Sequence, residues 1–182
     1  MTDNKSRFKK MTSRDVQAHV PPVVPLQGAA EAMHVGNSDT HFVDIGDGTL
    51  IQLLMVDLSQ NIWITRNRMQ PGTRVIKHYH TGPVYAFTLQ GKWFYDEYPE
   101  TVNEAGSFLF EPAGSVHTLV IPKEQEDETI VWFLIHGTNI NIDETGDVVS
   151  IADAFNVLEG YRYLCTEQGK SSDAVIVMGA QN

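Results

Sequence analysis

The sequence has very little cysteine: Cys165 is the only one among 182 residues. An intramolecular disulfide and a thiolate-bound metal cluster are therefore both excluded. Long apolar runs are also missing, since none approaches the roughly 20 residues that span a bilayer, and the amino-terminal stretch lacks the apolar core of a secretory signal. These absences predict a cytoplasmic protein that makes no membrane contact.

Basic residues are scarce as well. The chain has 13 Lys and Arg against 23 Asp and Glu, which gives a formal net charge of −10. An acidic surface repels nucleic acid and anionic lipid, so neither is an expected partner. The hydrophobic content of 42% and the length are those of one soluble domain with a substantial core.

The composition along the sequence predicts that the chain has three parts. Residues 1–20 are polar and locally basic, which predicts a disordered tail. Residues 21–165 form the predicted domain, which begins with an extended arm at Pro21–Pro25. Residues 166–182 are predicted to be a C-terminal tail, although residues 174–178 are apolar enough to pack as a strand or in an interface.

Short β-rich segments separated by turns occupy most of the domain. Eight or nine strands are expected between residues 41 and 136, with turns every 8–12 residues, and this pattern is typical of an all-β sandwich or barrel. One helix is expected over residues 151–158, with its N-cap at Ser150 and its end near Gly160.

Three histidines have spacings that suggest a metal site. His78 and His80 lie two residues apart on a predicted strand, so their side chains point to the same side. His117 follows a Pro-x-Gly turn that can return the chain beside them. His136 ends the most apolar strand and is either a further ligand, a proton shuttle or an ordinary hydrogen-bonded residue. No spacing supports His19, His34 or His41 as ligands.

This region resembles the cupin superfamily, which has two sequence motifs. The first is matched by Gly72, His78, His80 and Gly91, and the second by Gly106, Pro112, Gly114 and His117. The alternative is that these histidines and turn glycines are unrelated. The resemblance implies a single-domain cupin, an all-β double-stranded β-helix or jelly-roll barrel, with a short C-terminal helix.

Two positions depart from the cupin pattern. The metal-binding glutamate of the first motif falls at Val84, which is followed by Tyr85, and the final asparagine of the second motif is Ile121. The expected site is therefore three neutral imidazoles with no charged ligand. A divalent ion held in this way keeps open coordination positions, as in catalytic sites and unlike closed structural zinc sites.

Among three-histidine cupins, the chain resembles the 2,4'-dihydroxyacetophenone dioxygenases and the acetylacetone-cleaving dioxygenases. The matching residues are 77–95 and 110–118, and the expected helix at 151–158 with residues 161–163 resembles their C-terminal element. This resemblance implies a non-haem Fe(II) enzyme that uses O2 to cleave a carbon–carbon bond next to a carbonyl. The implied substrate is 2,4'-dihydroxyacetophenone, converted to 4-hydroxybenzoate and formate, or a related hydroxyketone.

Other functions remain open at this point. One is a dioxygenase acting on a β-diketone of the acetylacetone type. A second is a regulatory or sensor cupin that binds zinc without catalysis, and a third is a sugar- or small-acid-binding cupin that uses its metal as a Lewis acid. Imidazole ligands suit iron and zinc alike, so the ligand set does not choose between these metals.

The resemblance also suggests roles for residues around the metal. Glu111 is expected to orient a metal ligand from outside the coordination sphere, or else to face solvent on its strand. Tyr85, Tyr95, Trp63 and Phe110 are candidates to line the substrate pocket, with simple barrel packing as the alternative for each. The expected partners are a small-molecule ketone and further copies of the chain in a dimer or tetramer.

Overall fold

A large antiparallel sheet forms one wall of the domain because its strands alternate inward and outward residues. The computed structural model describes residues 31–179, and the strands of this part lie in Met33–Asn182, one of two units into which the chain divides. The sheet has the order β1 (Val43–Asp44), β2 (Thr49–Asp57), β3 (Ile62–Met69), β10 (Thr129–His136), β5 (Val84–Gln90) and β8 (Phe108–Glu111). On β3, for example, Trp63, Thr65 and Met69 are buried and their neighbours are not.

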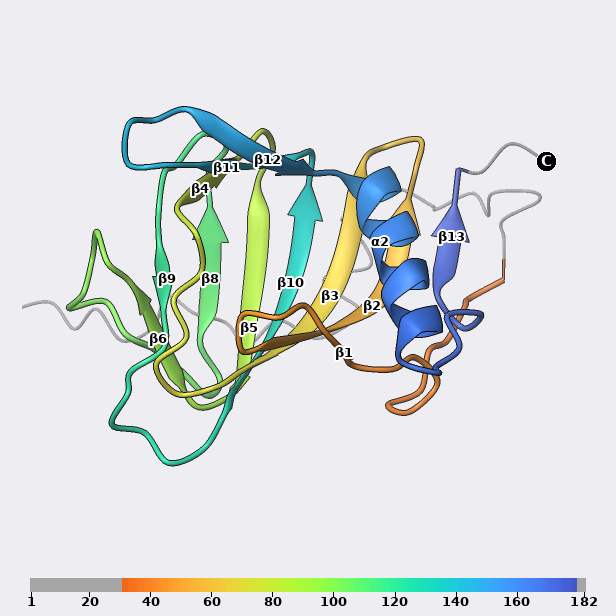
Figure 1. Ribbon diagram of the computed structural model, residues 1–182, viewed down its shortest axis with the longest axis horizontal. Helices are drawn as coiled ribbons and strands as arrows, with labels where there is room; N and C mark the ends of the chain where they lie inside the picture. The colour runs from red at the N-terminus through yellow and green to blue at the C-terminus, as the bar shows by residue number, and fades with distance from the viewer. Residues whose placement is uncertain (1–30, 180–182) are drawn as a thin grey trace, which may run out of the picture. The chain divides into compact units, whose positions relative to one another are not determined.

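The opposite wall consists of shorter strands. One group is β12 (Val148–Ala152), β11 (Asn139–Ile142) and β4 (His78–His80), and the other is β7 (Asn103–Glu104), β6 (Lys92–Tyr95) and β9 (Leu119–Val120). Isolated bridge pairs at Arg74–Val120 and His78–His117 connect β4 and the residues before it to β9 and the residues before it. Large side chains such as Trp93, Leu53 and Met69 are fully buried between the walls. The described part is thus all-β with one helix, as predicted (Figure 1).

The helix begins three residues later than predicted and extends further. It is α2 (Ala154–Glu167), and its N-cap is Asp153, whose carboxylate accepts from the backbone of Asn156 while the Asn156 side chain accepts from the backbone of Asp153. Ser150 and Ile151 belong instead to β12. Gly160 does not end the helix, because the buried residues Tyr161 and Cys165 continue its packed face beyond it.

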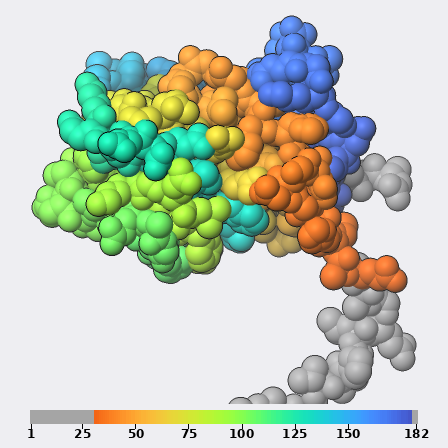
Figure 2. All heavy atoms as spheres, turned by 90° about the horizontal axis from the view of Figure 1, so that it is seen from below, coloured from red at the N-terminus to blue at the C-terminus, as the bar shows by residue number. Residues whose placement is uncertain are grey.

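The predicted C-terminal tail is corrected, because residues beyond 166 form part of the domain and the helix includes Glu167. The strand suggested for residues 174–178 is present: β13 (Ile176–Met178) pairs in parallel with β2. The Tyr161 hydroxyl donates to the carbonyl of His41 at 2.6 Å, which ties the helix to the first strands. Figure 2 shows these blue C-terminal residues against the orange N-terminal strands.

The predicted tail at residues 1–20 and the predicted arm at Pro21–Pro25 lie outside the described residues. Within residues 31–179, no helix has both the length and the apolar character needed to cross a membrane.

Candidate metal centre

The structure brings the three histidines of the two motifs together. His78 and His80 lie on β4, and the bridge between His78 and His117 places the third imidazole beside the first. The backbone groups of His78 and His117 exchange two hydrogen bonds, of 3.0 and 2.9 Å. These two main-chain hydrogen bonds therefore hold His78 and His117 next to each other.

The three imidazoles form a compact buried cluster. Their candidate ligand atoms all lie within 4.8 Å of one another, and the residues are 8%, 6% and 2% exposed for His78, His80 and His117. Nδ1 of His78 lies 2.7 Å from the carbonyl oxygen of Ile76. This contact requires the proton on Nδ1 and leaves Nε2 of His78 free to bind a metal ion.

Unpartnered polar atoms show that these residues fit a divalent cation. Nδ1 of His80, Nε2 of His117 and Oε2 of Glu111 are buried and have no hydrogen-bond partner among the described residues. Burial of such atoms without a partner is costly. A metal ion bound by the imidazoles would satisfy Nε2 of His117 and lie next to the carboxylate.

The electrostatics keep the imidazoles in the form that binds metals. Burial, with a smaller effect of the neighbouring histidines, lowers the pKa of His80 to about 3. Burial and the adjacent His78 lower the pKa of His117 to about 3. Burial also lowers the pKa of His78. The three rings are therefore neutral at neutral pH, and no proton must leave before a metal ion binds.

Glu111 points into this cluster and does not face solvent. It is 4% exposed, and its Oε2 lies 3.3 Å from Nε2 of His117 and 3.6 Å from Nε2 of His80. Its Oε1 accepts a hydrogen bond from the hydroxyl of Tyr95. Burial raises the pKa of Glu111 to about 7, although the hydrogen bond from Tyr95 opposes this rise.

Strand pairing explains how a carboxylate reaches a site whose usual glutamate position is Val84. In the β5–β8 ladder, Val84 lies directly opposite Glu111, and such pairs have Cβ atoms about 5 Å apart. Val84 is fully buried, so both side chains point inward. The adjacent strand therefore brings the carboxylate of Glu111 beside the imidazoles, although Val84 replaces the glutamate of the motif.

A cavity of about 310 Å³ opens onto these residues. His78, His80, Tyr95 and Glu111 line it at the metal end, and apolar side chains including Trp63, Met69, Phe133 and Ile135 form much of the rest. This size and lining are typical of a site for a small organic ligand. Trp63 and Tyr95 therefore line this cavity, and their role in a substrate pocket stays a prediction.

Tyr85 and Phe110 lie outside the cavity, which corrects their predicted role as pocket residues. They pair directly across β5 and β8, one position from the inward pair Val84–Glu111. Because strand side chains alternate faces, both point outward. Phe110 is 51% exposed. The Tyr85 ring also lies 6.1 Å from that of His136, so His136 belongs to this outer face and not to the metal cluster.

Sequence reasoning missed several polar residues that line the cavity: Thr49, Thr65, Asn67, Asn139 and Asn141. Asn139 and Asn141 pair directly with His80 and His78 through the β11–β4 ladder. Their inward direction depends on strand register, and a threonine or asparagine in a strand carries no sequence signal of its own that would reveal it.

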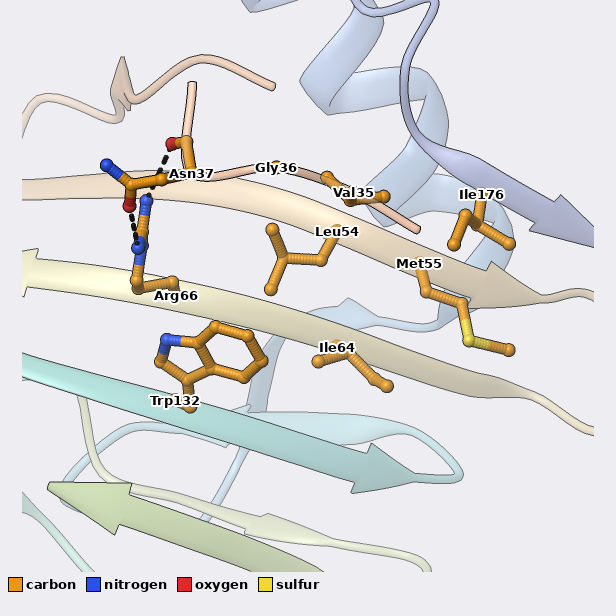
Figure 3. A pocket seen from close by; sticks show the side chains of 9 residues that line it. All are labelled: Val35, Gly36, Asn37, Leu54, Met55, Ile64, Arg66, Trp132 and Ile176. Atoms are coloured by element: carbon orange, nitrogen blue, oxygen red, sulfur yellow. Dashed lines mark hydrogen bonds between the residues drawn. The ribbon is translucent and has the colours of Figure 1, made fainter. Parts of the chain in front are cut away.

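A second cavity, of about 340 Å³, lies on the outer face of the large sheet. Figure 3 shows its lining residues, with Arg66 bonded to Asn37 beside Trp132 and Leu54. Arg66 donates to the side chain of Asn37 at 2.6 Å and to its carbonyl at 3.1 Å. These bonds attach the segment before β1 to β3. The sheet separates this cavity from the histidines.

The pKa shifts predict how the stability of the metal-free protein depends on pH. Between pH 4.5 and 6.5, His80 and His117 bind protons only when unfolded, whereas Glu111 binds one only when folded. The unfolded state thus gains about one net proton from these three groups, and stability falls by about 1.4 kcal/mol per pH unit on acidification. Thermal unfolding of chelator-treated protein should show a melting temperature about 4–8 °C lower at pH 5 than at pH 6.5.

The matched variant Glu111→Gln tests the sign of each contribution. Without the opposing glutamate, only the histidines with lowered pKa values contribute, and the melting temperature should fall more steeply with acidification than in the wild-type protein. A melting temperature of the wild-type protein that rises between pH 6.5 and 5 would contradict the lowered histidine pKa values.

Comparison with known proteins agrees with this architecture. A family model described as "ChrR Cupin-like domain" matches residues 30–139. A protein of unknown function with a cupin-like fold from Ralstonia eutropha JMP134 is 28% identical, with a TM-score of 0.77 over 86% of this chain and 98% of its own. No curated protein sequence matches the chain.

Two solved structures with lower sequence identity show similarity in fold only. An RmlC-like cupin from the same Ralstonia strain is 22% identical, with a TM-score of 0.70 over 76% of this chain and 92% of its own. An acetylacetone dioxygenase from Acinetobacter johnsonii is 19% identical, with a TM-score of 0.63 over 80% of this chain and 99% of its own. The expected single-domain cupin barrel is thereby confirmed.

Proposed function

The chain belongs to the ChrR cupin-like family, and on this premise we propose that it is a non-haem Fe(II) dioxygenase. It cleaves the carbon–carbon bond next to the carbonyl of an enolisable ketone. The observation that carries the proposal is the buried cluster of three neutral imidazoles facing a cavity, with one carboxylate, Glu111, beside the ligand atoms. Such a set holds an ion on one side and leaves room for a substrate on the other.

His78, His80 and His117 would hold the metal. Bound Fe(II) would supply a Lewis acid for the ketone oxygens and a redox centre for O2. With 2,4'-dihydroxyacetophenone as substrate, one carbon–carbon bond breaks and both oxygen atoms enter the products, 4-hydroxybenzoate and formate. Fold similarity to an acetylacetone dioxygenase supports a β-diketone as the second candidate substrate.

Glu111 is suited to move the proton when the ketone enolises. Burial raises its pKa to about 7, close to the value that makes a carboxylate an effective proton acceptor at neutral pH. The Tyr95 hydroxyl occupies Oε1 of Glu111, so Oε2, which has no partner among the described residues, is the atom that takes the proton. Trp63 and Phe133 line the same cavity and keep water from the reacting carbon.

Metal content and oxygen uptake test this proposal together. We expect protein purified without added metal to contain iron, and to consume oxygen with hydroxyacetophenones or β-diketones in proportion to that iron. Chelation should abolish the uptake and Fe(II) should restore it. Protein that contains zinc and consumes no oxygen after reloading with Fe(II) would contradict the proposal and favour a zinc-binding regulatory cupin.

A further inference from the structure

Aromatic side chains cover part of the outer face of the large sheet. The aromatic face, defined as Tyr85, Phe87, Phe108, Phe110 and Trp132, takes its members from β5, β8 and β10. Tyr85 pairs directly with Phe110 in the β5–β8 ladder. Two residues further along β5, Phe87 pairs with Phe108 in that ladder and with Trp132 in the β5–β10 ladder. Residues two apart on a strand share one side of the sheet, so all five rings point away from the metal cluster.

The rings of the aromatic face contact one another. The ring centroids of Phe87 and Phe108 lie 5.2 Å apart, and that of Tyr85 lies 5.5 Å from that of Phe110 and 6.4 Å from that of Phe108. Phe87, Phe108, Phe110 and Trp132 nevertheless remain between 38% and 57% exposed. Single exposed apolar residues are ordinary on a protein surface, whereas a contiguous group indicates a surface that binds another molecule.

The chain itself covers only the neighbouring part of this side of the sheet. The segment before β1 lies over β3, where Arg66 donates to the side chain of Asn37 at 2.6 Å, a contact that Figure 3 shows beside Trp132. The guanidinium of Arg68 likewise lies 5.0 Å from the centroid of the Phe42 ring. Within residues 31–179, no segment covers the aromatic face in this way, as the exposure of its rings shows.

The charge distribution favours a second copy of the chain as the occupant. A formal net charge of −10 makes two copies repel each other over most of their surface. The outward positions of β5, β8 and β10 carry no Asp, Glu, Lys or Arg. By contrast, the exposed Val148 and Ile151 belong to a hairpin whose loop carries Asp143, Glu144 and Asp147. Two copies that met through this hairpin would place like charges next to each other.

The area of the aromatic face is sufficient for a stable contact. An aromatic side chain can bury roughly 150–250 Å², so four residues that are about half exposed offer on the order of 100 Å² each. Two copies would therefore bury about 800 Å² through these rings alone. With the half-buried Tyr85 and Leu134 beside them, the contact reaches the roughly 1,000 Å² expected of a specific interface.

We propose that the aromatic face is the contact surface of a symmetric dimer, in which the same rings of two copies pack against one another around a two-fold axis. This gives the oligomer expected from the sequence a defined interface. In such a contact every residue occurs twice, so one substitution changes both halves of the interface.

Sedimentation equilibrium of the full-length protein tests this proposal. We expect a dimer at micromolar concentrations, or a tetramer built from such dimers. Phe87→Glu and Phe110→Glu should each raise the Kd of the dimer at least about 30-fold, because a central aromatic residue is replaced by a charge in both copies. Phe110→Leu keeps an apolar side chain and should retain the dimer.

Phe155→Glu is the matched control. Phe155 lies on α2 and is more exposed than any residue of the aromatic face, and its substitution should leave the Kd unchanged. A monomeric wild-type protein overturns the inference and indicates a different protein as the occupant. A dimer that persists in both glutamate variants, or one that is lost equally in Phe155→Glu, also overturns it. Thermal unfolding verifies that each variant is folded. Because the measurement involves neither oxygen nor a ketone, its result is independent of the dioxygenase activity proposed above.

Discussion

Replacing His117 by alanine is expected to abolish metal retention. The imidazole is 2% exposed, and its Nε2 has no hydrogen-bond partner among the described residues and lies in the cluster of candidate ligand atoms. Its removal leaves two imidazoles, and we expect the affinity for Fe(II) or Zn(II) to fall by more than the roughly 100-fold that loss of an outer residue can cause. Metal analysis after gel filtration measures this, and His78→Ala should give the same result.

The control for this prediction is His136→Ala. His136 lies on the outer face of β10, next to the ring of Tyr85, and its substitution should leave the metal content unchanged. The His117 ring also stacks on the Tyr95 ring, with 4.2 Å between the two ring centroids. Because the substitution removes this packing contact, thermal unfolding must show that His117→Ala is folded. A folded His117→Ala protein with a full complement of metal would refute the three-histidine site.

Replacing Glu111 by glutamine is expected to lower kcat by about 100- to 10,000-fold, the usual effect of removing a general base. Glutamine keeps the size of the side chain but cannot accept the substrate proton. Because the histidines remain, metal should be retained, with its affinity reduced by at most about 100-fold, as for other residues that contact metal ligands. Oxygen uptake at saturating substrate separates this loss from a change in KM.

Glu104→Gln is the matched control, because the side chain of Glu104 is 67% exposed at the surface and its substitution should change neither kcat nor metal content. Unchanged turnover in Glu111→Gln would show that Glu111 takes no part in proton transfer. Complete loss of metal from this variant would show instead that the carboxylate of Glu111 is itself a ligand, in place of the motif glutamate that Val84 replaces.

Some features of the domain could be predicted because they depend on local geometry. The two-residue spacing of His78 and His80 places both on one face of any strand, and positive-φ glycines such as Gly72, Gly91 and Gly114 mark turns. The β11–β12 hairpin was missed because its strands lack an inward apolar face: Asn139 and Asn141 line the cavity, and Val148, Val149 and Ile151 are exposed.

The direction of individual side chains could not be predicted in the same way. Tyr85 and Val84 are neighbours, and a shift of one residue in the β5–β8 register would exchange their faces and those of Phe110 and Glu111. That register depends on pairing between segments far apart in the chain. It determines that the carboxylate lies inside and the aromatic rings outside.

The amino-acid sequence by itself therefore determined that this protein is an all-β barrel with three histidines suited to one metal ion, because turn residues and strand alternation act over a few positions. Only the tertiary structure decided what surrounds that ion. Long-range strand pairing brings Glu111 opposite Val84, and the packing of two sheets places Thr65 and Asn67 in the same cavity as the histidines. The residues that line this cavity come from separate strands, and no local sequence pattern predicts that they lie together.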